Sequence, residues 1–150
     1  MAARKTFYDI DAQNWPVVVV RFPGVPETSD DIDAFQAHFI AVLELARKGS
    51  ARVPPTPLYI AMNINGIGNT SLSQQLRAPA FIKDIRPYVV GVVQRTALTA
   101  SSPLVRTIFE AITAAQALST PYELFDNEED ALASLQTYNQ TRLAELQSQQ

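Results

Sequence analysis

The stretch of residues 63–73, which reads NINGIGNTSLS, is the richest in groups that could do chemistry. It follows residues 58–64, whose apolar character is typical of an interior strand. Open α/β sheets bind ligands at the carboxyl ends of such strands, so this stretch is the first candidate for a binding site. The residues expected to contact a partner or ligand are Asn63, Asn65, Gly66, Gly68, Asn69 and, in the helix that follows, Arg77.

Two features of this stretch invite a more specific interpretation. Gly66 and Gly68 are compatible with a phosphate-cradling turn, but the third glycine of a dinucleotide fingerprint and the lysine of a P-loop are missing. A plain tight turn is therefore favoured. The serine hydroxyl groups, on Ser71 or Ser73, are placed to cap the next helix by accepting a hydrogen bond from a free backbone N–H group.

Other reactive groups are scarce. The chain has no cysteine, which excludes a thiolate nucleophile, a thiolate metal site and a disulfide framework. Its single histidine, His38, excludes a multi-histidine metal site and disfavours Ser-His-Asp chemistry. Asp30, Asp31 and Asp33 fall at a predicted helix start, where carboxylates complement the positive helix end. We therefore expect no enzymatic activity, no metal and no cofactor.

Composition narrows the class of protein. The 150 residues are 47% hydrophobic and 18% charged, which excludes intrinsic disorder for most of the chain. A net charge of -3 argues against a nucleic-acid binder. No apolar run approaches the roughly 18 residues that a membrane span requires, and the N-terminus lacks the apolar core of a signal peptide. These features predict a cytoplasmic domain without a membrane span.

Two strands and a helix are predicted near the N-terminus. Residues 6–11 alternate polar and apolar side chains like a half-exposed edge strand, and residues 17–22 form a β-branched run typical of a buried strand. The connection between them is too short for a helical crossover, so we expect an antiparallel hairpin. A helix over residues 29–48 follows, with Gly49 as its C-terminal stop.

The next helix is predicted from Ser71 or Ser73 to Ile85. Pro79 should kink it or start a second helix. Residues 88–93 read as a strand that continues to about residue 98. The apolar side chains expected to face inward from this helix are Leu72, Leu76, Ala80, Phe81 and Ile85.

Three further elements complete the chain. Ser102 and Pro103 mark a helix start. A short strand over residues 122–125 and an acid-capped final helix follow. The residues predicted to form the apolar face of the helix that begins at Pro103 are Leu104, Val105, Ile108, Phe109, Ile112 and Ala115.

The resulting order is ββαβαβαβα, and it predicts an α/β domain with a five-stranded mixed sheet and four to five helices. The sheet should be mostly parallel, with the first strand antiparallel at its edge. Residues 1–150 contain no recognisable linker or repeat, so we expect a single domain, with residues 1–5 and 147–150 frayed.

Three local motifs resemble the SpoIIAA-like branch of the STAS superfamily, the sulfate transporter and anti-sigma factor antagonist domains. They are SPLVR at 102–106, PYELFD at 121–126 and EEDALASL at 128–135, with a looser match of VVVVRFPG at 17–24. The resemblance covers residues 6–138 as a pattern of helix caps and core positions. It implies a SpoIIAA/STAS-like fold and a protein-interaction domain rather than an enzyme.

The same resemblance implies a partner and a switch. SpoIIAA-type members bind a kinase-like anti-sigma factor and are switched off by phosphorylation at the start of the helix after the third strand. Here the matching hydroxyl groups belong to Thr70 and Ser71, although the acidic-x-Ser signature is absent. A phosphate there would add roughly -1.5 to -2 charges beside the docking surface.

We therefore predict a non-enzymatic regulatory module that docks a protein partner, or a second copy of itself, through the surface around residues 63–77. Residues 71–110 carry five basic and two acidic side chains, and residues 123–150 carry six acidic and one basic, which is compatible with a homo-oligomer. The alternative is a small-ligand or lipid carrier whose pocket lies next to the turn at residues 65–69.

Overall fold

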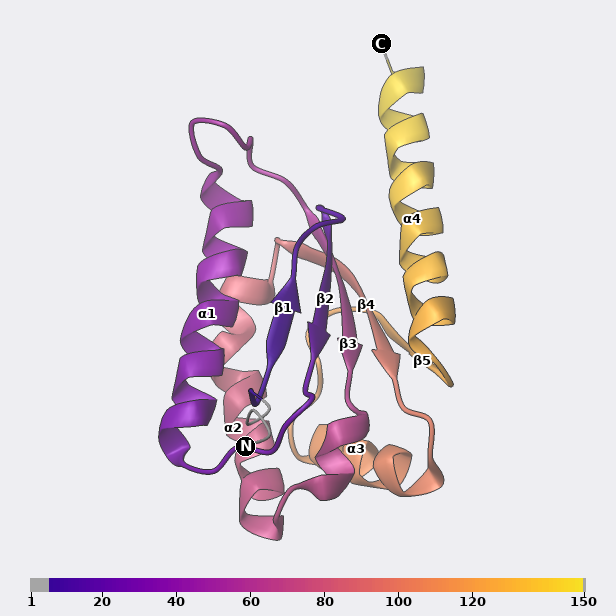
Figure 1. Cartoon of the computed structure of the whole chain (residues 1–150). Coiled ribbons are helices and arrows are strands. Elements are labelled where there is room, and N and C mark those ends of the chain that lie inside the picture. Colours follow the sequence, from indigo (N-terminus) through magenta and orange to yellow (C-terminus); the bar gives the residue numbers. More distant parts are fainter. Residues whose placement is uncertain (1–5, 150) are drawn as a thin grey trace, which may run out of the picture.

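The structure is a computed structural model that describes residues 6–149 (Figure 1). The predicted fraying of residues 1–5 falls outside these residues. The elements in chain order are β1 (Asp9–Asp11), β2 (Val17–Arg21), α1 (Ser29–Lys48), β3 (Leu58–Asn63), the 3-10 helix η1 (Asn65–Asn69), α2 (Leu72–Val89), β4 (Val93–Thr99), α3 (Pro103–Ala115), β5 (Tyr122–Phe125) and α4 (Glu128–Ser148).

The five strands form one mixed sheet in the order β1-β2-β3-β4-β5. β1 pairs antiparallel with β2, with Ile10 opposite Val20, and each later pair is parallel. The α/β class, the five-stranded mixed sheet and the antiparallel first strand are thus confirmed. The first strand is shorter than predicted, because only its last three residues pair with β2.

The helices divide into two layers. Helices α1, α2 and α3 lie on one face of the sheet and α4 lies alone on the other (Figure 1). The strand β2 is buried on both faces. Val18 and Val20 pack in the core that includes α1 and α2, whereas Val17 and Val19 pack in the core that includes α4. This alternation is that of a strand buried on both faces.

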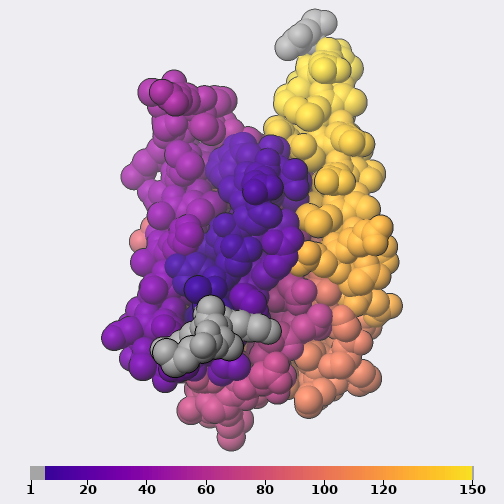
Figure 2. All heavy atoms as spheres, viewed as in Figure 1, coloured from indigo at the N-terminus to yellow at the C-terminus, as the bar shows by residue number. Residues whose placement is uncertain are grey.

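α4 packs closely on its face of the sheet. The small side chains of Ala61, Ala97 and Ala131 allow the helix to approach the strands, and Leu135 is fully buried among them. Tyr138, three residues after Leu135, still contacts β4, because the Arg95 guanidinium carbon lies 4.2 Å from its ring centroid. Figure 2 shows the last turns of the helix standing clear of the rest of the molecule. It extends through Ser148, into the segment predicted to fray.

On the opposite face, aromatic rings join α1 to α2. Phe35 of α1 stacks on Phe39 with 5.7 Å between ring centroids, and on Phe81 of α2 with 5.5 Å between centroids. α2 contacts both α1 and α3, and its buried side chains Ile85 and Val89 pack in the same core as the strand residues. These neighbours hold α2 in place over the sheet.

The sequence prediction was wrong at the end of α2. Tyr88 and Val89 belong to this helix, not to the following strand, which begins at Val93. β-branched residues near 89–93 favour a strand locally, but Ile85 and Val89 lie four residues apart and bury the same helix face. The helix also runs as one element through Pro79 and Pro87, so Pro79 does not start a second helix.

The predicted inward face of α2 was also partly wrong. Leu72 and Leu76 are each 70% exposed and Ala80 is exposed, whereas Phe81 is half-buried and Ile85 is buried. The first two turns of α2 extend past the edge of the sheet, so no core lies beneath them (Figure 1). In α3, Leu104 and Ala115 are exposed, although both were expected on its apolar face.

Candidate functional site

The loops that follow β3, β4 and β5 meet at the carboxyl edge of the sheet. The Asn65 side-chain amide donates to Ser101 Oγ at 3.0 Å, and its Oδ1 accepts from the Ser101 backbone N–H at 2.8 Å. Ser101 Oγ in turn donates to the carbonyl of Asp126 at 2.6 Å. Arg106 completes the set with an ion pair to the Asp126 carboxylate. Polar groups from three loops therefore form one connected network.

Of the candidate asparagines, Asn65 is the one that binds Ser101 in this network. Asn63 Oδ1 accepts from the backbone N–H of Asn65 at 3.0 Å and so shapes the turn that leads into η1. Asn69, at the end of η1, is exposed. Sequence reasoning missed Ser101 and Asp126, because their 36- and 25-residue separations from their partners carry no local signal.

The two candidate glycines have separate packing roles. A Cβ atom on Gly66 would lie 2.9 Å from the carbonyl oxygen of Phe22, so glycine permits the close approach of η1 to the segment after β2. A Cβ atom on Gly68 would make an ordinary 3.5 Å contact with Val105. Neither glycine has a positive φ angle, and η1 takes the place of the predicted plain turn.

The candidate hydroxyl groups lie at the start of α2. Thr70 Oγ1 donates to the Ile67 carbonyl at 2.6 Å. Ser71 is the N-cap of α2, because its Oγ accepts from the Gln74 N–H at 3.2 Å while Gln74 Oε1 accepts from the Ser71 N–H at 2.9 Å. Arg77 lies one turn further along, 3.9 Å from an Asp33 carboxylate oxygen.

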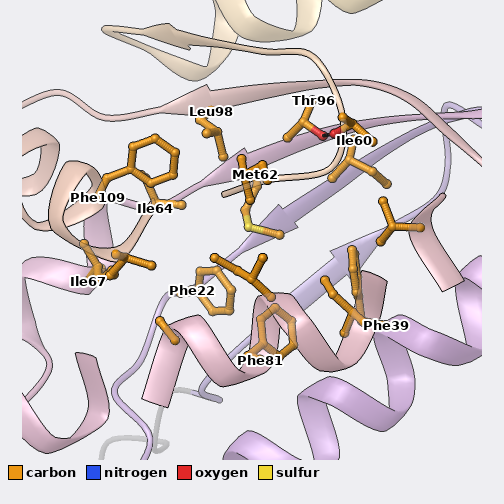
Figure 3. A pocket seen from close by; sticks show the side chains of 18 of the residues that line it. Phe22, Phe39, Ile60, Met62, Ile64, Ile67, Phe81, Thr96, Leu98 and Phe109 are labelled. Atoms are coloured by element: carbon orange, nitrogen blue, oxygen red, sulfur yellow. Dashed lines mark hydrogen bonds between the residues drawn. The ribbon is translucent and has the colours of Figure 1, made fainter. Parts of the chain in front are cut away.

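An apolar cavity of about 230 Å³ lies between α2 and the sheet (Figure 3). Figure 3 shows Phe81 of α2 and Met62 of β3 on opposite sides of the open space. The aliphatic and aromatic residues that line it come from all three helices of this face and from the strands: Phe39, Ile60, Met62, Ile64, Ala78, Phe81, Ile82, Ile85, Val89, Val93, Leu98, Phe109 and Ile112.

One end of the cavity belongs to the stretch singled out in the sequence. Gly66, Ile67 and Thr70 line it there, close to Phe22 and Gly24. Asn63, Asn65, Gly68, Asn69, Ser71 and Arg77 do not line it. The turn at residues 65–69 therefore borders the cavity through Gly66 and Ile67, while the Asn65 side chain belongs to the loop network.

The other end of the cavity lies toward the connection between α3 and β5. Thr96 of β4 and Thr120 line it there, with 3.3 Å between their hydroxyl oxygens. Figure 3 places Thr96 and Ile67 at opposite ends of the space. Ser119 also lines this end and is exposed, so the cavity reaches solvent here.

No charged side chain lines the cavity. Its few polar side chains are hydroxyl groups, so it favours an apolar molecule over an ion or a sugar. Within residues 6–149, no group of three histidine or acidic side chains is arranged to hold a metal ion. No helix in this same range is long and apolar enough to cross a membrane.

The sequence carries no signal for this cavity. An apolar residue that lines a void has the same type and spacing as one that fills a core, and Phe81 and Ile85 were predicted only as core residues. Comparison of the chain with protein-family models, with curated proteins and with solved structures gives no match, so the resemblance to the SpoIIAA-like branch of the STAS superfamily remains a prediction.

Proposed function

We propose that this protein binds a small apolar or amphiphilic molecule in the cavity between α2 and the sheet. The observation that carries the proposal is an apolar cavity of about 230 Å³ that lies between α2 and the sheet and opens to solvent at one end. It is a binding function rather than an enzymatic one. No nucleophile and base pair lines the cavity, and its walls supply shape and apolar surface.

The size of the cavity supports this proposal energetically. Protein interiors pack as densely as organic crystals, and voids larger than a water molecule are few. At about 24 cal/mol per Å³, an enclosed void of about 230 Å³ would cost at most about 5.5 kcal/mol relative to a filled core, and less where the cavity opens to solvent. That is comparable to the whole stability of many domains, so a ligand that fills the space stabilises the fold substantially.

The volume also sets the scale of the ligand. An engineered cavity of about 150 Å³ accommodates benzene, which corresponds to about 25 Å³ for each carbon atom. On this scale a cavity of about 230 Å³ takes about nine carbon atoms. A medium-length alkyl chain, or a compact ring system of similar size, fits this measure.

Titration calorimetry with 1-decanol tests the proposal on the full chain. Ala78 lines the cavity, so Ala78→Leu places extra carbon atoms inside it and should weaken binding at least about tenfold while raising Tm. Ala80 is exposed on the same helix, so Ala80→Leu is the matched control and should leave binding unchanged. Absence of binding to the wild-type protein, or equal binding by Ala78→Leu, contradicts the proposal.

A second candidate function is docking of a protein partner through the surface around residues 63–77. Leu72 and Leu76 lie four residues apart on one face of α2 and are each 70% exposed, which is unusual for large apolar side chains. Ser71 is exposed beside them, so a phosphate there would add negative charge next to the apolar face. A kinase-like regulator or a second copy of the chain is the proposed partner.

Light scattering of the purified protein tests the self-association form of this second candidate. Leu72→Gln combined with Leu76→Gln should reduce the mass to that of a monomer, because it removes the apolar face. Leu143→Gln combined with Leu146→Gln changes two exposed leucines of α4 and is the control. A wild-type monomer contradicts self-association. For the phosphorylation of Thr70 or Ser71, an unmodified 63–77 peptide after incubation with a competent kinase contradicts the switch.

A further inference from the structure

The two ends of the cavity differ in what they offer a ligand. At the η1 end, the proton of Thr70 Oγ1 is already donated to the Ile67 carbonyl at 2.6 Å. At the other end, Thr96 and Thr120 share one hydrogen bond between their hydroxyl groups, 3.3 Å apart. One of these two hydroxyl protons therefore has no acceptor among the residues that the structure describes. A ligand with an acceptor oxygen would be bound at this end.

The positively charged side chain of Arg86 lies beside the Thr96 and Thr120 end of the cavity. Arg86, in the last turn of α2, donates from Nη2 to the Ala117 carbonyl at 3.0 Å. Ala117 directly precedes Leu118, Ser119 and Thr120, which line the cavity. This contact holds the guanidinium at the connection that borders the open end of the cavity, and its remaining N–H groups are free to donate to an anion.

The charge of this cation is not neutralised by a neighbour. Arg86 is exposed and forms no ion pair with any residue from 6 to 149. Arg86 is therefore the positive charge that lies beside this end of the cavity.

The positive charge of Arg86 attracts an anionic group to the open end of the cavity, but the apolar interior does not accommodate a charged group. Burial of an unpaired ion in an apolar cavity is strongly unfavourable, so an anionic group must stay at the mouth while its chain enters. Ser119 is exposed there, which keeps the group in contact with water. The polar end and the apolar interior together match an amphiphile with one anionic end.

We infer that the ligand is a medium-chain carboxylate whose carboxylate group lies at the mouth between Thr120 and Arg86 and whose alkyl chain extends inward toward Ile67. This inference rests on the proposed function, because it names the chemical class of the molecule in the same cavity. The carboxylate accepts from the hydroxyl pair and from the guanidinium, and about nine carbons of chain occupy the interior.

A comparison of decanoate with 1-decanol tests this assignment, because the two have the same chain length and differ in charge. Titration calorimetry at neutral pH should show that Arg86→Gln weakens decanoate binding at least about fivefold and leaves decanol binding unchanged. Added salt should likewise weaken only decanoate binding. Arg47→Gln is the matched control, since Arg47 also donates to a backbone carbonyl near the end of α2, that of Pro87 at 2.7 Å.

The outcomes separate the inference from the proposed function. If decanol binds in the cavity but Arg86→Gln leaves decanoate binding unchanged, the inference is wrong and the proposed function stands. The same holds if Arg86→Gln weakens both ligands equally. If neither ligand binds the wild-type protein, both are wrong. Thr120→Val serves as a second variant, and it should also weaken decanoate more than decanol.

Discussion

Arg21 of β2 binds Glu128 at the start of α4 through both carboxylate oxygens, with Nε–Oε1 at 2.9 Å and Nη2–Oε2 at 3.0 Å. The two residues are 107 positions apart, so this contact joins the second strand to the last helix. The pKa of Arg21 is raised, chiefly because Glu128 accepts its hydrogen bonds, and Asp11 and Asp9 add to the effect. The pair fixes where α4 begins on its face of the sheet.

We expect a measurable coupling energy between these two residues. In a double-mutant cycle with Arg21→Met and Glu128→Gln, urea unfolding should give a coupling of about 1 kcal/mol. The geometry is bidentate, which favours a larger value, but the side chains are 35% and 28% exposed, so water screens the attraction. A coupling that does not fall when salt is added would argue against an ionic origin.

The pair Lys48 and Glu44 is the control for this cycle. Its Nζ–Oε2 distance of 2.8 Å is as short, but it joins neighbouring turns of α1 and the Lys48 side chain is 72% exposed. Lys48 lowers the pKa of Glu44, chiefly by donating a hydrogen bond. This pair therefore contributes above the ordinary Glu pKa and its contribution is lost as the pH falls through the lowered value. We expect a smaller coupling than for Arg21 and Glu128.

The α4 layer should depend on Leu135 more than on any leucine further along the helix. Leu135 is fully buried against the sheet, so Leu135→Ala should lower the free energy of unfolding by about 3 kcal/mol. Leu143 is 45% exposed on the same helix, and Leu143→Ala should change the free energy of unfolding by less than about 0.5 kcal/mol. Chemical denaturation of both variants gives the comparison, and equal losses would contradict the layer assignment.

Ser71 should stabilise α2 as its N-cap. Ser71→Ala removes the acceptor for the Gln74 N–H and should cost about 1 kcal/mol of stability. Ser71→Asp retains an acceptor at the helix start and should cost much less, while it adds the negative charge that the docking proposal requires. Ser73 Oγ lies 3.0 Å from Ser71 Oγ, so Ser73→Ala removes this contact but leaves the capping acceptor in place and should cost less than Ser71→Ala. A loss as large as that of Ser71→Ala would contradict the cap.

Local sequence rules predict some elements of this fold correctly and fail at others. Val17–Arg21 and Leu58–Asn63 are strands with continuous apolar character, and Ser102 and Pro103 begin α3 as local rules require. Local rules fail at Tyr88 and Val89, where burial of Val89 against the core outweighs the β-branched preference. Pro79 and Pro87 stay within α2 for the same reason: the packing of the helix against α1 and α3 offsets the missing backbone donors.

The sequence likewise predicts part of the candidate site and not the rest. Parallel strands bring their carboxyl ends together, so the sequence could indicate that Asn63 and Asn65 lie at a shared edge of the sheet. It could not reveal that Asn65 binds Ser101, or that Thr96 faces Thr120 across the far end of a cavity. Those contacts depend on the distance between α2 and the strands, which is a property of the packed layers and not of any one segment.

Two glycines with positive φ angles provide the last prediction. Gly49, the C-cap of α1, has φ of 69°, and an added Cβ would lie 2.6 Å from the Val53 carbonyl oxygen. Gly91 has φ of 84°, and an added Cβ would meet nothing within 4 Å. Both Gly→Ala changes should cost about 1 kcal/mol of backbone strain, and Gly49→Ala should cost a further 1–3 kcal/mol, roughly, from the clash. Thermal and urea unfolding of the two variants measure the difference, and equal losses would show that the loop after α1 moves to relieve the contact.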